Sequence, residues 1–481
     1  MGQLGILLGL GLLLWLAYRG WSVLLVGPAA ALVAAAFSGE PLLAHWTQTF
    51  MGAAARFVAQ FFPLFLLGAL FGKLMDDTGS ALAIARSLAG RLGRQRAILA
   101  VVLACALLTY GGVSLFVVAF VVAPVAEALF REANVPHRLM PATIALGAFT
   151  FTMTAMPGTP AIQNAIPMPV FGTTAFAAPG LGLIASAVML AFGVWWLGRV
   201  EAAARRAGEG YGGPHGTMTA STDFVRERAT AADNFDPAEF EHGHHFQQGV
   251  PVWLAALPIP VVVVVNLGMS LVVLPLLETG FLAEPRFGPT SLAAVGGIWS
   301  VATALLAAIV VVVLTSRRRL TALRETMDAG ANASVLPVMN TASMVGFGAV
   351  VAALPAFAVI RDALVSIPGG PLVSIAVATN VVAGITGSAS GGLIIALEAM
   401  GDTYVRMAAA AGIDPALMHR VAAIGCGGLS GLPHNGAVVT LLSICGATHR
   451  GSYRDIAMVM VVGSILALAV IIILGKLIGS F

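Results

Sequence analysis

Long apolar runs alternate with short polar connections along the whole chain. Uninterrupted apolar runs occupy about 2–18, 21–37, 51–72, 180–198, 250–275, 289–314, 334–358 and 455–478. A helix needs roughly 20 apolar residues to cross the hydrocarbon core of a membrane, so each run is close to the length of one crossing. The pattern therefore predicts an all-α polytopic membrane protein.

Four further apolar stretches contain Gly, Pro, Ser, Thr or Asn near their middles. They lie at 97–130, 138–176, 371–400 and 416–446. Lipid cannot satisfy a broken backbone, so such interruptions persist only inside protein or beside a water-filled cavity. We interpret 97–130 and 371–400 as re-entrant hairpins. We interpret 138–176 and 416–446 as broken helices that each cross once, with their breaks near the membrane midplane.

Composition makes the lipid bilayer the main solvent of this chain. Of 481 residues, 58% are hydrophobic and only 10% are charged, which is outside the usual range for a soluble protein. The basic residues are scattered, so nucleic acid is not an expected partner. The sequence contains no Walker-type phosphate loop and no HExxH motif, and it predicts neither a cofactor nor a metal site.

The basic residues are distributed unevenly between the two sides of this topology. Most of the 25 lysines and arginines fall on one side, which the positive-inside rule makes cytoplasmic. Both termini are then extracytoplasmic, and the cell inner (plasma) membrane is the expected location. Lys73 is assigned to the cytoplasmic side and Asp76 and Asp77 to the cytoplasmic surface, whereas Arg420 is one of the few basic residues assigned to the extracytoplasmic side.

An internal repeat divides the chain. Residues 199–248 form a polar segment that we interpret as a cytoplasmic linker between a first half, 1–198, and a second half, 249–481. An offset of 276 residues places Gly111 on Gly387, Ser114 on Ser390 and Pro157 on Pro433. Each half has five crossings plus one re-entrant hairpin, and an odd number of crossings predicts inverted repeats.

The paired interruptions are the expected substrate site. Discontinuous helices expose N–H groups and the positive ends of half-helices near the midplane, where an anion can bind. Packing is an alternative explanation for any single glycine, but less so for four clustered breaks. The candidate substrate-binding residues are Thr109, Gly111, Gly112, Ser114, Gly158, Thr159, Asn164, Gly387, Ser388, Ser390, Gly391, His434, Asn435, Gly436 and Thr440.

The charged residues at the breaks limit the class of ligand that we expect. His434 is the only histidine at a break, and it is a candidate ligand contact, proton carrier or helix cap. The breaks themselves contain no Arg or Lys. A dicarboxylate usually meets a bidentate Arg, whereas helix ends and hydroxyls can hold one carboxylate. A small monocarboxylate is therefore the expected substrate.

Three segments resemble a known family. Residues 67–79, LGALFGKLMDDTG, resemble the signature of the gluconate permease (GntP-type) family within the ion-transporter superfamily. Residues 387–392, GSASGG, and 432–440, LPHNGAVVT, resemble its hydroxybutyrate-permease-like branch. The resemblance implies uptake of a hydroxylated monocarboxylate by ion symport, usually proton-driven, through an elevator-type motion in a homodimer. Residues 432–440 differ from the sugar-acid pattern, which favours a 3-hydroxybutyrate-like acid over gluconate.

The sequence therefore predicts a secondary active symporter rather than an enzyme. Its expected substrate is a small hydroxylated monocarboxylate, with H⁺ favoured over Na⁺ as the coupling ion. A symporter of gluconate or a related sugar acid with H⁺ is the alternative. From other classes, a passive anion channel and an intramembrane enzyme using Ser430 and His434 remain open, although the broken helices contain no Asp or Glu to orient the histidine.

Overall fold

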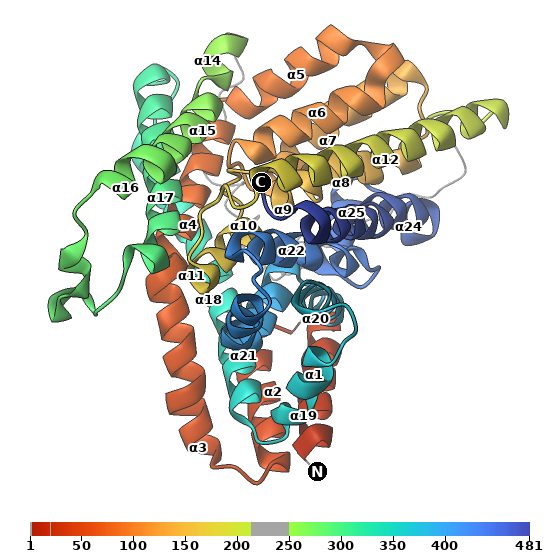
Figure 1. The fold of residues 1–481 in the computed structure, drawn as a ribbon. Helices are drawn as coiled ribbons and strands as arrows, with labels where there is room; N and C mark the ends of the chain where they lie inside the picture. The colour runs from red at the N-terminus through yellow and green to blue at the C-terminus, as the bar shows by residue number, and fades with distance from the viewer. Residues whose placement is uncertain (1, 20, 213–249) are drawn as a thin grey trace.

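The computed structural model describes residues 2–19, 21–212 and 250–481 (Figure 1). Throughout these ranges the regular structure is helical, which confirms the all-α class. Most of the predicted linker, 199–248, lies outside the described residues. The helix α12, Pro179–Arg206, includes the start of that segment.

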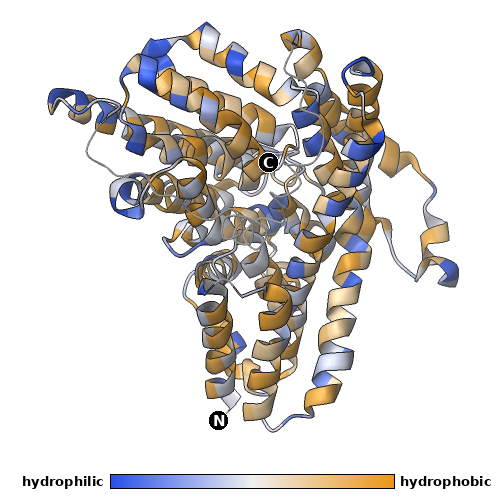
Figure 2. Ribbon diagram, turned by 180° about the vertical axis from the view of Figure 1, so that it is seen from behind, coloured by the Kyte–Doolittle hydropathy of each residue, from blue (hydrophilic) through white to orange (hydrophobic). Residues whose placement is uncertain are grey.

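Several helices are long and apolar enough to cross a membrane, as expected for a polytopic membrane protein. In the described ranges, six spans meet this test by length and composition. Figure 2 shows hydrophobic residues along most of the helices, with hydrophilic residues mainly near their ends. The spans are α3 to α4 (Leu42–Asp77), α12, α14 to α16 (Val252–Leu276), α17 (Leu292–Thr315), α18 (Leu323–Ala353) and α24 to α25 (His449–Ile478).

The helices α1 (Gly2–Tyr18) and α2 (Val23–Phe37) are shorter and pack against each other. Together with α19 (Phe357–Val365), they lie at the N-terminal end of the molecule in Figure 1. At the other end, α5 (Ser80–Leu92) lies beside α6 and bends sharply from it, by 102°.

Two of the four interrupted stretches fold as helix pairs around short turns, and the other two are helices broken by irregular segments. Helices α6 (Ala97–Tyr110) and α7 (Leu115–Ala133) pack together, as do α20 (Pro371–Thr386) and α21 (Ala389–Ala410). Residues 155–161 and 432–435 break the other two stretches. The flanking helices are α8 (Met140–Ala148), α9 (Phe151–Thr154), α10 (Ile162–Ala165) and α11 (Pro167–Phe171) in the first, and α22 (Pro415–Gly427) and α23 (Gly436–Ile444) in the second.

Helix boundaries in the two halves correspond at the 276-residue offset. Shifted by 276, α4 (Met51–Asp77) becomes 327–353, inside α18, and α6 becomes 373–386, inside α20. The same shift carries α8 to 416–424, inside α22. The matched helices α4 and α18 pack along each other. The order of the elements is thus repeated, while the opposite orientation of the halves in a membrane and their boundaries remain predictions.

A buried ion pair within α4 is hydrogen-bonded to α18. Lys73 Nζ lies 3.1 Å from Asp77 Oδ1, and their side chains are only 6% and 1% exposed. Thr326 Oγ1 donates a hydrogen bond of 2.6 Å to Asp77 Oδ2. The assignment of Asp77 to the surface is therefore wrong, and Lys73 is buried beside it. Helix α4 continues to Asp77 and packs against α18, and the charges tolerate burial because they are paired and hydrogen-bonded.

Candidate functional site

In the first half, the turn between α6 and α7 lies against the break of the neighbouring helix. The hydroxyl of Tyr110 donates a hydrogen bond of 2.9 Å to the carbonyl of Pro157. A Cβ atom on Gly112 would lie 3.1 Å from Pro160 Cγ. The turn at 111–114 and the break at 155–161 therefore lie against each other and form one region of irregular backbone.

The second half repeats this contact. His434 Nε2 lies 2.8 Å from the carbonyl of Gly384, and since a carbonyl only accepts, the ring nitrogen donates. A Cβ atom on Gly387 would lie 3.5 Å from His434 Cδ2 and 3.7 Å from Asn435 Cα. Each turn between paired helices thus lies against the break of its own half.

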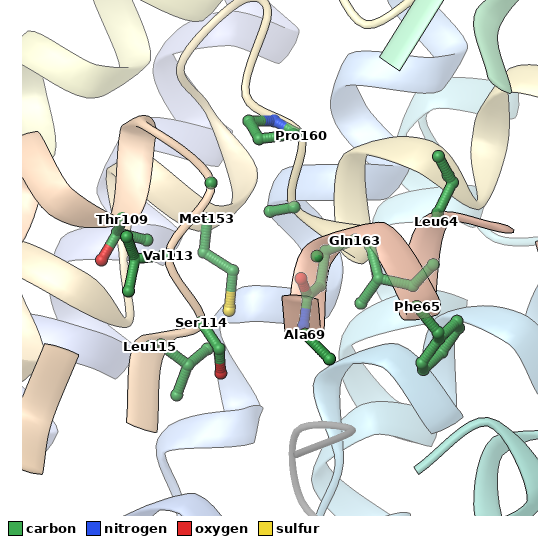
Figure 3. A pocket seen from close by; sticks show the side chains of 14 residues that line it. Leu64, Phe65, Ala69, Thr109, Val113, Ser114, Leu115, Met153, Pro160 and Gln163 are labelled. Atoms are coloured by element: carbon green, nitrogen blue, oxygen red, sulfur yellow. The ribbon is translucent and has the colours of Figure 1, made fainter. Parts of the chain in front are cut away.

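A cavity of about 110 Å³ lies between α4 and the irregular backbone of the first half (Figure 3). The hydroxyls of Thr109 and Ser114 line it, and within the described chain both are buried without a hydrogen-bond partner. The side chain of Gln163, only 1% exposed, also lines the cavity. The rest of the lining is Leu64, Phe65, Gly68, Ala69, Gly112, Val113, Leu115, Met153, Pro160, Ala161 and Ile162.

The chemistry of this cavity suits a small amphipathic anion. Helix α7 begins at Leu115 in the cavity wall, and Ser114 makes no side-chain capping bond to it. The first N–H groups of a helix have no partner inside the helix and carry its positive end. The two hydroxyls can donate as well, while Leu64, Phe65 and Met153 supply an apolar wall. A carboxylate on a short carbon chain matches both parts.

Two of the predicted first-half residues are otherwise occupied. Asn164 Nδ2 donates to the carbonyls of Thr159 and Ala175, each at 3.0 Å, so this side chain ties the break together. A Cβ atom on Gly111 would lie 2.7 Å from Ile259 Cγ1, which indicates close helix packing. Of the first-half candidates, the structure brings Thr109, Gly112 and Ser114 to the cavity, while Gly111, Gly158, Thr159 and Asn164 do not line it.

Two predicted second-half residues start helices. Ser388 Oγ accepts a hydrogen bond of 3.1 Å from Gly391 N at the start of α21. Asn435 Oδ1 accepts one of 2.7 Å from Ala437 N at the start of α23. Such caps account for these residue types without a ligand. The other candidates, Gly387, Ser390, Gly391, His434, Gly436 and Thr440, are likewise outside the first-half cavity, whose lining is drawn from residues 64–163.

His434 faces a different space. It lines an apolar groove of about 610 Å³ together with Trp15 of α1 and Leu432. Because Nε2 carries the proton donated to Gly384, Nδ1 is the ring nitrogen that would accept another. Ser430 Oγ donates to the carbonyl of Gly427 at 2.8 Å, so the hydroxyl and the imidazole needed for the enzyme alternative are each bonded elsewhere.

A buried arginine lies behind the first break, although the sequence placed it on the extracytoplasmic side. Arg420 of α22 is 0% exposed. It donates to the carbonyls of Ala177 at 2.7 Å and Thr154 at 3.2 Å, and to Asn164 Oδ1 at 3.1 Å. The breaks themselves contain no Arg or Lys, but the fold brings this guanidinium from α22 against the backbone around the first of them. The contact joins helices about 250 residues apart, so only their packing could reveal it.

The same helix turn contributes a buried histidine. His419 Nε2 lies 3.1 Å from Asn164 Oδ1, and Thr173 Oγ1 lies 2.6 Å from Nδ1. Neither His419 nor Arg420 is among the site residues predicted from the sequence. The available signal was a pair of ionisable residues inside an apolar stretch, where such residues are costly and usually have a specific partner.

Comparison with known proteins identifies the family. The chain is 42% identical over 474 residues to the uncharacterized transporter YxjC of Bacillus subtilis (strain 168), covering 97% of this chain and 98% of that protein. The GntP family permease profile matches residues 3–193. The chain belongs to the GntP permease family.

Membership in the GntP family confirms the predicted family and the general function. This permease is a transporter, and the similarities point to transport rather than catalysis. The membrane-length apolar helices fit a multi-pass membrane protein of this kind. The name of this relative specifies no substrate, and the cavity is the feature of the structure that bears on the ligand.

Proposed function

We propose that this GntP permease is a secondary active symporter that takes up a small hydroxylated monocarboxylate, such as 3-hydroxybutyrate, together with protons. The observation that carries the proposal is the cavity at the start of α7, with its two unpartnered hydroxyls. A carboxylate at the helix start would meet N–H groups and hydroxyls, and the substrate's own hydroxyl would meet Gln163.

Size supports the short acid. The cavity of about 110 Å³ compares with the roughly 10–15 Å³ that one water molecule needs on the same measure, and it is below the roughly 300 Å³ at which pockets for drug-sized ligands begin. Gluconate, with a six-carbon chain and five hydroxyls, needs more space and more polar partners. It remains the alternative substrate.

Charge supports a single carboxylate. Arg420 lies behind the break, and its guanidinium is already bonded to backbone carbonyls and to Asn164. It contributes a positive field without a free donor pair for a second carboxylate. This retains the predicted monocarboxylate for a different reason from the one that the sequence suggested.

The matched helix boundaries support inverted repeats, and we propose that the halves insert with opposite orientation and with both termini extracytoplasmic. An elevator-type motion in a homodimer of the inner membrane is part of the same proposal. His434 is the proposed proton carrier, since its Nδ1 is available to take a proton beside the second break.

The decisive experiment is uptake by purified protein in liposomes. We expect labelled 3-hydroxybutyrate to accumulate above its external concentration under an inward proton gradient, and to lose this accumulation when a protonophore is added. Replacing Na⁺ with choline should leave uptake unchanged. Downhill flux alone would indicate a channel, chemically altered substrate would indicate an enzyme, and accumulation of gluconate in preference would favour the alternative substrate.

Thr109→Val and Ser114→Ala should weaken substrate binding without destabilising the protein. Neither hydroxyl has a hydrogen-bond partner among the described residues, so its removal breaks no hydrogen bond there. We expect KM for uptake to rise about 2- to 10-fold in each variant, as expected for one lost hydrogen bond of about 0.5–1.5 kcal/mol, while the melting temperature stays equal or rises. Ser270→Ala is the matched control, because Ser270 Oγ is also buried with no partner in the described ranges but lies outside the cavity. An unchanged KM in both cavity variants would remove these hydroxyls from the site.

A further inference from the structure

A second pocket, rich in arginine, lies where two membrane-length helices end. It has a volume of about 460 Å³ and is formed by the last turns of α12, the first turns of α24 (His449–Ala457) and the segment before α8. Four guanidinium groups line it, those of Arg138, Arg199, Arg450 and Arg454. It shares no residue with the cavity at the start of α7.

The charges of this pocket do not balance. Arg138 makes two hydrogen bonds to Glu209, at 2.7 and 3.0 Å, and one to Asp455 at 2.9 Å, so one arginine uses both carboxylates of the pocket. The other three guanidinium groups have no carboxylate partner within the described part of the chain. Four positive and two negative charges leave the pocket with a net charge of +2.

Aromatic side chains place the pocket at the level of a membrane interface. The Arg454 guanidinium lies 5.7 Å from the ring centroid of Trp196, and that of Arg199 lies 6.0 Å from Trp195. Trp195 is 56% exposed on the outer side of α12. Tryptophan is enriched where helices pass from hydrocarbon into lipid headgroups, so a position at headgroup depth fits the three arginines that have no carboxylate partner in the described residues.

We propose that this basic pocket binds the phosphodiester headgroup of an anionic phospholipid. Guanidinium groups match the geometry of phosphate oxygens, and basic pockets at the ends of membrane helices are suited to acidic headgroups. The acyl chains would run along the apolar surface of α12 beside Trp195. A lipid is favoured over a soluble phosphate because the ends of two membrane-length spans line the pocket and the exposed Trp195 lies against Arg199 in its wall. This site is independent of the transported substrate.

Native mass spectrometry of the purified full-length protein tests the proposal, with phosphatidylglycerol as the probe and phosphatidylcholine as the neutral comparison. The double variant Arg450→Gln/Arg454→Gln removes two unpaired charges and leaves the ion pairs of Arg138 intact. We expect it to weaken phosphatidylglycerol binding on the order of tenfold, and phosphatidylcholine binding by less than about twofold. Each single substitution should give an intermediate loss, which keeps the test available if the double variant does not fold.

Arg317→Gln/Arg318→Gln is the matched control. These arginines are exposed in the turn after α17 and carry the same charge outside the pocket. We expect this control to retain phosphatidylglycerol binding within about twofold. Equal losses in the two double variants would show a general charge effect and overturn the proposal. Displacement of phosphatidylglycerol by millimolar inorganic phosphate would also overturn it, because the pocket would then be a site for soluble anions.

Discussion

Arg420→Met should prevent the permease from reaching a stable fold. In the native protein the guanidinium supplies hydrogen bonds to the carbonyls of Thr154, Ala175 and Ala177 and to Asn164 Oδ1, with the arginine fully buried. Hydrogen bonds to a charged group contribute about 1.5–3 kcal/mol each, and buried acceptors left without donors add a desolvation cost. The sum approaches the whole stability of a typical domain, about 5–15 kcal/mol.

Size-exclusion chromatography and thermal unfolding in detergent measure this effect. We expect Arg420→Met to aggregate or to melt far below the wild type. Arg420→Lys keeps the charge but not the planar fork, so it should recover only part of the stability. Arg406→Gln on the exposed side of α21 is the control, since its one hydrogen bond, to Thr403, lies at the surface. A well-folded Arg420→Met protein would show that the first break holds its shape without this arginine.

Gly112→Ala should abolish most uptake. Gly112 has φ +100°, a conformation that costs an L-residue about 1–3 kcal/mol. Its new methyl group would also lie 3.1 Å from both Leu305 Cδ2 and Pro160 Cγ, so the turn would have to move away from the break. Because this turn forms the cavity wall between Thr109 and Ser114, we expect initial uptake to fall at least about tenfold, which corresponds to about 1.4 kcal/mol.

Gly93→Ala separates backbone strain from crowding. Gly93 also has positive φ, +66°, but nothing lies within 4 Å of the position that its Cβ would occupy. It should lower stability modestly and change uptake per folded molecule by less than about twofold. Similar uptake in the Gly112→Ala and Gly93→Ala variants, corrected for the amount of folded protein, would remove the first turn from the transport site.

The fold was largely predictable because helix length and interruption are local properties. Runs of apolar residues located the spans, and Gly-rich and Pro-rich segments located the turns at 111–114 and 387–388 and the breaks at 155–161 and 432–435. The site was only partly predictable. Thr109 and Ser114 reach the cavity, whereas Asn164 is occupied by the break itself and Asn435 caps a helix. A polar residue beside a break can bind a ligand or form hydrogen bonds to the backbone. The local sequence does not distinguish these two roles.

The sequence by itself determined the membrane class, the family, the positions of the interruptions and the 276-residue repeat, because each follows from residue type and spacing along one chain. Only the tertiary structure decided which interruptions meet, which hydroxyls remain unpartnered, and that Arg420 is buried behind a break more than 240 residues away. Those contacts depend on how helices distant in sequence pack. Because Arg420 is buried against the first break, its guanidinium donates hydrogen bonds to backbone carbonyls there instead of to water.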